Sequence, residues 1–242
     1  MKTVCDYFIL FMIYSFLGWL METIVCSIPI RKIVNRGFMI GPYCPIYGAG
    51  ALMITLMLKK YMEDPIALFI MAILICSVLE YFTSYVMEKI FKARWWDYSD
   101  KKMNINGRIC LTNSLAFGVI GVLLMYYVNP YFIQILQHLS NNSVYIISTT
   151  LFVIFVADYI VSSKLMLGFA DTLINIHKDN TEEITQKIKE ILREKSIFTK
   201  RIANAFPDVK IKIDSIKKRI NIEKENLRKE VEKIRSKIEK DK

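Results

Sequence analysis

The stretch PIALFIMAILICSVLEYFTSYVMEKI, residues 65–90, gives the clearest indication of the fold of this chain. A helix that crosses a bilayer needs roughly 20 mostly apolar residues, and this stretch meets that requirement. Four more windows of the same character lie on either side of it, at about 5–28, 38–58, 109–128 and 143–163. The sequence therefore predicts an all-α integral membrane protein with about five transmembrane helices in residues 1–177.

The remaining part of the chain, residues 178–242, has a different composition. It holds 20 of the 33 Lys and Arg residues, so it should lie in water as a basic helical tail. Apolar residues recur at helical spacing over 209–238, which predicts an amphipathic helix that can form a coiled coil, either with a helical partner or by self-association. A solvated helix that packs on its own neighbour fits the pattern equally well. A tail attached to a membrane domain more often meets lipid headgroups or a protein partner, so we expect no nucleic-acid partner.

The distribution of Lys and Arg predicts the orientation in the plasma membrane, because positive loops stay in the cytoplasm. Basic residues are concentrated in the first connection, in the third connection and in the tail, whereas the connection 129–142 has none. This arrangement places the N-terminus outside and the C-terminus in the cytoplasm.

Three acidic residues lie within the predicted spanning helices: Glu22, Glu80 and Asp158. A charged side chain in the bilayer core is costly, so such residues are candidates for a functional site. The orientation places all three in the cytoplasmic half of the bundle, near Arg36 and Arg108, which lie just before the second and fourth windows. They are candidates for binding an ion or a substrate. An alternative is an ion-pair network that only holds the helices together.

The beginning of the second window is rich in residues that interrupt helices. Irregular backbone at membrane depth is tolerated only where protein or a water-filled cavity surrounds it, and transporters build substrate sites from such segments. An interfacial loop followed by a shorter helix is the alternative. The candidate residues of this broken-helix segment are Gly37, Gly41, Pro42, Tyr43, Pro45, Tyr47 and Gly48.

The third connection contains three further candidates: Trp96, Asp97 and Asn106. Trp96 suits the headgroup region, whereas an aromatic belt has no need of Asp97 or Asn106. The five cysteines are scattered without a CxxC pair, and the two histidines lie in no metal-binding motif, so we expect neither a metal nor a cofactor.

Four blocks carry a resemblance to a known family: FLGWLMETI (16–24), NRGFMIGPYCPIYGAGAL (35–52), LEYFTSYVME (79–88) and WWDYSDKKMNINGRICL (95–111). They resemble the bacterial family described as "putative ABC-transporter type IV", or ABC transporter permease, over roughly residues 7–170. The resemblance implies a permease subunit. Because the chain has no GxxxxGK[ST] phosphate loop, the ATPase would be a separate subunit.

Three functions are compatible with these features. The first, which we favour, is a permease-like transporter component with a polar cavity in the cytoplasmic half of the bundle. The second is a membrane-embedded enzyme for a lipid or lipid-linked substrate, with one of the acids as general base. The third is a membrane scaffold or sensor that recruits a partner through its tail.

Overall fold

The computed structural model describes residues 2–31, 37–91 and 94–176. In this part of the chain the structure is mainly helical, which confirms the predicted all-α class. Four helical stretches are long and apolar enough to cross a membrane: Lys2–Ile28, Pro65–Phe91, Leu111–His138 and Asn141–Leu167. The tail 178–242 and Arg36 lie outside the described residues, so the predictions for them stay predictions.

The first and third windows form single helices, α1 (Lys2–Ile30) and α3 (Pro65–Phe91). The second window differs from the sequence prediction, because helix α2 covers only Pro45–Met57 and residues 37–44 are not helical. We call residues 37–44 the irregular segment. Proline fixes its own backbone and disfavours helix at the residue before it, so helix can begin only at Pro45, where proline is tolerated. A short 3₁₀ turn, η1 (Lys59–Tyr61), follows α2.

The fourth window is longer than predicted. Helix α4 (Leu111–Leu123) continues through a π-helical turn, η2 (Leu124–Val128), into α5 (Asn129–His138). The prediction that residues 129–142 form a connection was therefore wrong for most of that range. Pro130 removes one backbone donor, and the adjoining π turn accommodates the change without ending the helix. The last helix, α6 (Asn141–Ile176), starts directly afterwards and extends beyond the predicted 143–163.

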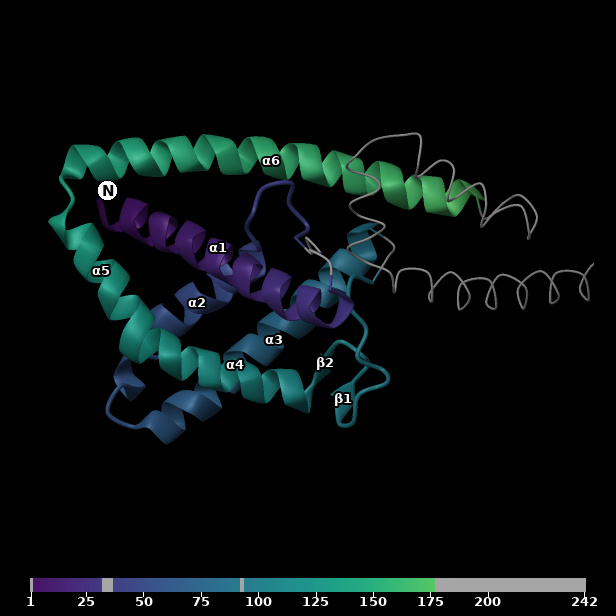
Figure 1. The fold of residues 1–242 in the computed structure, drawn as a ribbon, viewed down its shortest axis with the longest axis horizontal. Helices are drawn as coiled ribbons and strands as arrows, with labels where there is room; N and C mark the ends of the chain where they lie inside the picture. Colours follow the sequence, from purple (N-terminus) through teal and green to yellow (C-terminus); the bar gives the residue numbers. More distant parts are fainter. Residues whose placement is uncertain (1, 32–36, 92–93, 177–242) are drawn as a thin grey trace, which may run out of the picture.

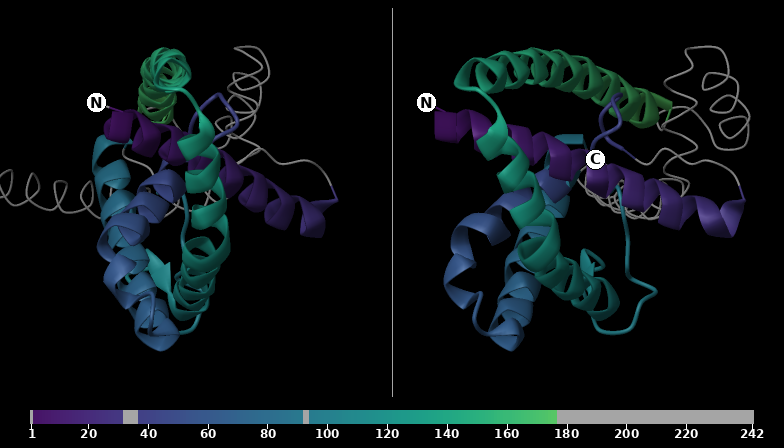
Figure 2. Two further views of the ribbon diagram at one scale, coloured as in Figure 1. Left: turned by 90° about the vertical axis from the view of Figure 1, so that its left-hand side faces the viewer. Right: turned by 60° about the vertical axis from the view of Figure 1, so that its left-hand side comes forward.

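The helices are arranged around α1 (Figures 1 and 2). Helix α6 packs mainly on one side of α1, and α2 packs on another side, next to α3 and α4. The larger apolar core lies among α1, α2, α3 and η2, with one buried residue each from α5 and α6, and includes Leu10, Ile54, Leu68 and Leu124. A second apolar cluster joins α1 to the irregular segment through Met12 and Met39. Consequently α1 separates two interior environments, one toward α6 and one toward α3 and α4.

The connection between α3 and α4 contains a short antiparallel hairpin, β1 (Asn104–Ile105) and β2 (Ile109–Cys110), in which Ile105 pairs with Ile109. Asn106 and Gly107 both have positive φ, at 53° and 66°, which suits the Asn-Gly turn that the sequence indicates. The hairpin brings the loop back over the end of α3, so that its side chains reach the interior of the bundle.

Candidate functional site

Asp158 on α6 holds the irregular segment. Its carboxylate accepts hydrogen bonds from the backbone amides of Ile40 (3.0 Å) and Gly41 (2.7 Å) and from the hydroxyl of Tyr43 (2.5 Å). The Ser162 hydroxyl, one turn further along α6, also donates to it (2.7 Å). Non-helical backbone inside a membrane protein leaves amides that need acceptors, and a carboxylate satisfies several of them at once. The position of Asp158 is thus explained by the break in the helix.

Helix α2 begins in close contact with the middle of α1. The amide of Cys44 donates to the carbonyl of Ser15 at 2.9 Å, and a Cβ atom at Gly48 would collide with the Ser15 hydroxyl and the Phe11 carbonyl. Gly48 therefore allows the backbones of α1 and α2 to approach, as small residues do between membrane helices. This contact fixes where the first turn of α2 lies relative to α1.

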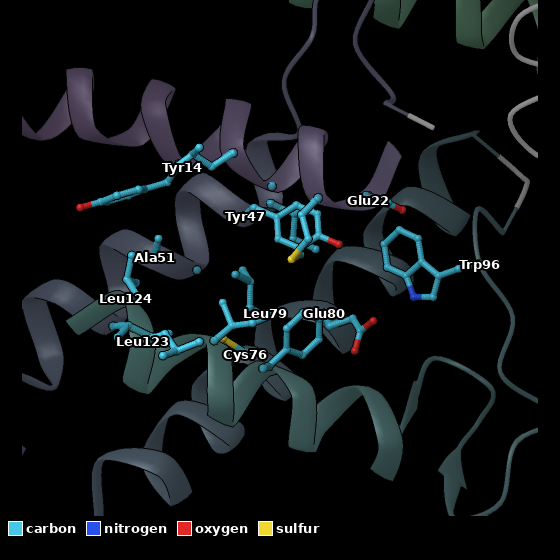
Figure 3. Close-up of a pocket in the computed structure, with 18 of the residues that line it drawn as sticks. Tyr14, Glu22, Tyr47, Ala51, Cys76, Leu79, Glu80, Trp96, Leu123 and Leu124 are labelled. Carbon is cyan, nitrogen blue, oxygen red and sulfur yellow. The ribbon is translucent and has the colours of Figure 1, made fainter. Parts of the chain in front are cut away.

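A cavity of about 400 Å³ lies on the other side of α1, away from Asp158 (Figure 3). Its walls come from α1, α2, α3, α4, η2 and the loop before the hairpin. Glu22 of α1 and Glu80 of α3 both line it, and Tyr47 of α2 lies between them and the apolar part. Among the described residues that line it, none is Lys, Arg or His. The cavity therefore has three acidic side chains on its described walls, the third being the exposed Asp97 of the loop, and no basic side chain.

Glu80 is the most deeply placed of these acids, with 5% of its surface exposed. The hydroxyl of Tyr98 donates to its Oε1 at 3.1 Å, while its Oε2 has no hydrogen-bond partner among the described residues. Burial, and then the adjacent Glu80 carboxylate, raise the pKa of the Tyr98 phenol above its usual range, so Tyr98 stays a donor. A buried carboxylate oxygen without a partner carries a large desolvation cost unless a proton or a ligand compensates it.

The opposite end of the cavity is apolar. Figure 3 shows Leu123 and Leu124 at this end, and Tyr14 of α1 also lies there. The Tyr14 hydroxyl donates to Oδ1 of the buried Asn129 at 2.7 Å, which satisfies two polar groups at the first turn of α5. The π-helical turn η2 presents Leu124 and Val128 to the cavity. The cavity is consequently acidic and aromatic at one end and hydrocarbon-lined at the other.

Arg108 pairs with a carboxylate on α3 that does not line the cavity. Its guanidinium pairs with Oε2 of Glu88 at 2.8 Å and donates to the Ser84 hydroxyl at 3.2 Å. It also lies over the rings of Tyr81 and Tyr85, at 5.6 and 5.4 Å from their centroids. Glu88 pairs in addition with Arg94 at 3.0 Å. The sequence alternative paired Arg108 with Glu22, Glu80 or Asp158, whereas in the structure its carboxylate partner is Glu88.

Of the three candidate residues in the connection between α3 and α4, two line the cavity and one contacts α3. Trp96 donates through Nε1 to the Arg108 carbonyl at 3.1 Å, and both Trp96 and the exposed Asp97 line the cavity. Asp97 accepts from the amide and hydroxyl of Ser99, at 3.1 and 2.6 Å. Asn106 donates to the Tyr81 hydroxyl at 2.9 Å, so it holds the hairpin against α3. The loop therefore forms the wall of the cavity nearest to solvent.

The candidates from the sequence divide into three groups in the structure. Glu22, Glu80, Tyr47, Trp96 and Asp97 line the cavity, while Arg108 and Asn106 hold the loop and hairpin against α3. The remaining group belongs to the irregular segment and its contacts, with Pro45 and Gly48 in the first turn of α2: Gly37, Gly41, Pro42, Tyr43, Pro45, Gly48 and Asp158.

Sequence reasoning missed several residues of the cavity wall, notably Tyr14, Cys76 and Tyr98. Cys76 lies four residues before Glu80 and so shares its helix face, a spacing that could have identified it. Tyr98 directly follows Asp97, but nothing in the sequence indicates that the loop folds back to Glu80.

The long apolar helices and the interior cavity define a polytopic α-helical membrane protein. The chain belongs to the family described as "Putative ABC-transporter type IV", whose model matches residues 9–163, and this confirms the resemblance of the sequence blocks. A search of curated proteins and a search of solved structures each found no match. The family and the helices together support a membrane transporter component, and the family suggests an ATPase partner.

Proposed function

We propose that this chain is a permease-like component of a membrane transporter and that the cavity binds the transported substrate. The observation that carries the proposal is the pair Glu22 and Glu80, which come from two different helices and face one cavity of about 400 Å³. Acidic residues inside spanning helices are costly and usually mark a pathway or a binding site. Arg108 pairs with Glu88 instead, which argues against a purely structural role for Glu80.

The orientation proposed for the chain is N-terminus outside and C-terminus in the cytoplasm, with residues 1–177 as the membrane domain. The loop 94–110 contains Arg94, Lys101, Lys102 and Arg108, which favours the cytoplasmic face. The exposed Asp97 of this loop lines the cavity. Under this orientation the acidic end of the cavity lies in the cytoplasmic half of the bundle and opens toward the cytoplasm.

The irregular segment supports the same function. Transporters often place substrate sites beside discontinuous helices, where non-helical backbone is surrounded by protein. Here the segment ends at Cys44, whose thiol lies 3.9 Å from Oε2 of Glu22, and Tyr47 of the cavity wall follows in the first turn of α2. A change in the segment would therefore alter the acidic end of the cavity directly. A separate ATPase subunit would supply the energy.

Cys76 offers a direct test, because it lines the cavity and the chain has only four other cysteines. A variant that keeps Cys76 alone is treated, in native membrane vesicles, with a methanethiosulfonate reagent that carries a fixed trimethylammonium charge and does not cross bilayers. We expect Cys76 to react from the cytoplasmic face, and to react from the outer face as well when the vesicles contain ATP.

The matched control keeps Cys110 alone, which is 2% exposed and does not line the cavity. It should react only after denaturation. If Cys76 proves unreactive from both faces while the denatured chain is fully labelled, the cavity is sealed and the proposal fails. Reaction from the cytoplasmic face alone, with or without ATP, would also contradict a transport pathway.

A further inference from the structure

We infer that the cavity takes an apolar organic cation, one that joins an alkylated ammonium or a similar positive group to a hydrocarbon body. This inference rests on the proposed function and specifies the chemical class of its substrate. The acidic end, the aromatic side chains around it and the apolar far end each carry one part of the argument.

The acidic end selects for positive charge. Glu80 is buried and its Oε2 has no hydrogen-bond partner among the described residues, and Glu22 lines the same cavity. The described walls contain no Lys, Arg or His that could pair with an anion. Around a carboxylate as buried as that of Glu80, opposite charges attract strongly and like charges repel. A cation would therefore be stabilised here, and an anion would be excluded.

The aromatic side chains favour an alkylated cation over a metal ion. Tyr47, Trp95, Trp96 and Tyr98 all line the cavity, and Tyr98 contacts Glu80 directly. Aromatic rings attract quaternary and alkylated ammonium groups through their faces. A hard metal ion would instead need about six oxygen ligands. Within the described part of the chain, no three His, Cys, Asp or Glu side chains lie together as metal ligands.

The far end accommodates hydrocarbon. From Glu22 back to Tyr14 the wall follows eight residues of α1, which corresponds to about 12 Å at the rise of an α-helix. Ile54, Leu124 and Val128 line the cavity beyond the acids. A small hydrated ion would leave this apolar wall in contact with water, whereas a molecule with an apolar body would cover it and bury apolar surface. The two ends together match a cation with an apolar part.

The experiment uses the purified full chain in lipid nanodiscs and follows its tryptophan fluorescence, since two of its three tryptophans line the cavity. Three probes are compared: tetramethylammonium, benzyltrimethylammonium and the neutral shape analogue neopentylbenzene. We expect saturable binding of benzyltrimethylammonium, weaker binding of tetramethylammonium and no saturable binding of the neutral analogue beyond its partition into lipid.

Two variants locate the binding site. Glu80→Gln keeps the size of the side chain and removes its charge, so the affinity for benzyltrimethylammonium should fall by about tenfold to a hundredfold. Glu63→Gln, an exposed residue outside the cavity, is the matched control and should bind as the natural chain does.

Equal affinities for the cation and its neutral analogue would overturn the inference, as would undiminished cation binding by a folded Glu80→Gln variant. The comparison of the three probes on the natural chain decides the question even if that variant does not fold. The two experiments distinguish the failure of one proposal from the failure of the other. If the reagent labels Cys76 from both faces but the chain shows no preference for the cation, the cavity is a pathway for another class of substrate and only the inference is wrong. If the reagent never labels Cys76, the proposed function is wrong, and so is the inference that rests on it.

Discussion

Replacing Asp158 by alanine should release the irregular segment while leaving the helices in place. The Asp158 carboxylate accepts the amides of Ile40 and Gly41 and the hydroxyls of Tyr43 and Ser162. Ile40 retains a second acceptor, the Ser162 hydroxyl at 3.1 Å. In the alanine variant three donors therefore lose this acceptor: the Gly41 amide and the hydroxyls of Tyr43 and Ser162.

The size of the effect at residues 37–44 follows from the two donors that belong to this segment, the Gly41 amide and the Tyr43 hydroxyl. Each buried donor left without an acceptor costs about 1–3 kcal/mol, and Asp158 is only half-buried, so water would partly replace it. We expect the free energy of local opening at residues 37–44 to fall by about 2 kcal/mol, which corresponds to a roughly 30-fold larger equilibrium constant for opening.

Hydrogen–deuterium exchange of the purified chain, read by mass spectrometry on peptides that cover 37–44, measures this opening. The expected result for Asp158→Ala is about 30-fold faster exchange in those peptides, with unchanged exchange in α3. Tyr43→Phe, which removes one of the four bonds, should give a smaller increase. Tyr159→Phe, at an exposed position next to Asp158, is the control and should have no effect. Unchanged exchange of residues 37–44 in the Asp158→Ala variant would refute the role assigned to this carboxylate.

Two further predictions concern the packing of α1 with α2 and the anchoring of the loop. Gly48→Ala should destabilise the chain by about 1–3 kcal/mol, because the added methyl group meets the Phe11 carbonyl at 2.5 Å, and should lower the thermal unfolding temperature in detergent. Gly50→Ala, whose methyl group would only touch Leu79 at 3.4 Å, should unfold at nearly the original temperature. Arg108→Ala should cost about 2 kcal/mol by removing the bonds to Glu88 and Ser84, with Arg108→Lys intermediate. An unfolding temperature for Arg108→Ala equal to that of the natural chain would show that the loop does not depend on this pair.

The class of fold and the break before α2 follow from properties that a sequence displays directly. Long apolar windows predict spanning helices because each residue contributes independently to transfer into lipid. The prolines and glycines between Gly37 and Gly50 predict non-helical backbone for a local steric reason. The prediction of a connection at 129–142 was wrong for most of that range, since whether a proline such as Pro130 ends a helix depends on whether neighbouring backbone can adjust, as the π turn η2 does here.

The sequence also placed Glu22, Glu80 and Asp158 at similar depth, yet it could not show which way each one faces. Depth along a helix can be counted from the residue numbers, whereas the direction of a side chain depends on which helices lie on either side. Helix α6 packs on one side of α1 and α3 lies on another, so Asp158 meets the irregular segment while Glu22 and Glu80 meet the cavity.

The two groups of acids are connected by the chain between them. Asp158 holds the backbone at Ile40 and Gly41, the Cys44 amide is bonded to Ser15 of α1, and Tyr47 then enters the cavity wall. A shift of α6 would reach the acidic end of the cavity through these few residues, because the segment has no helical hydrogen bonds of its own to resist it. In place of a single polar layer, the structure has a cavity lined by Glu22 and Glu80 and, separately, a support for one of its walls at Asp158. The support acts on this wall of the cavity through the segment that the prolines keep out of the helix.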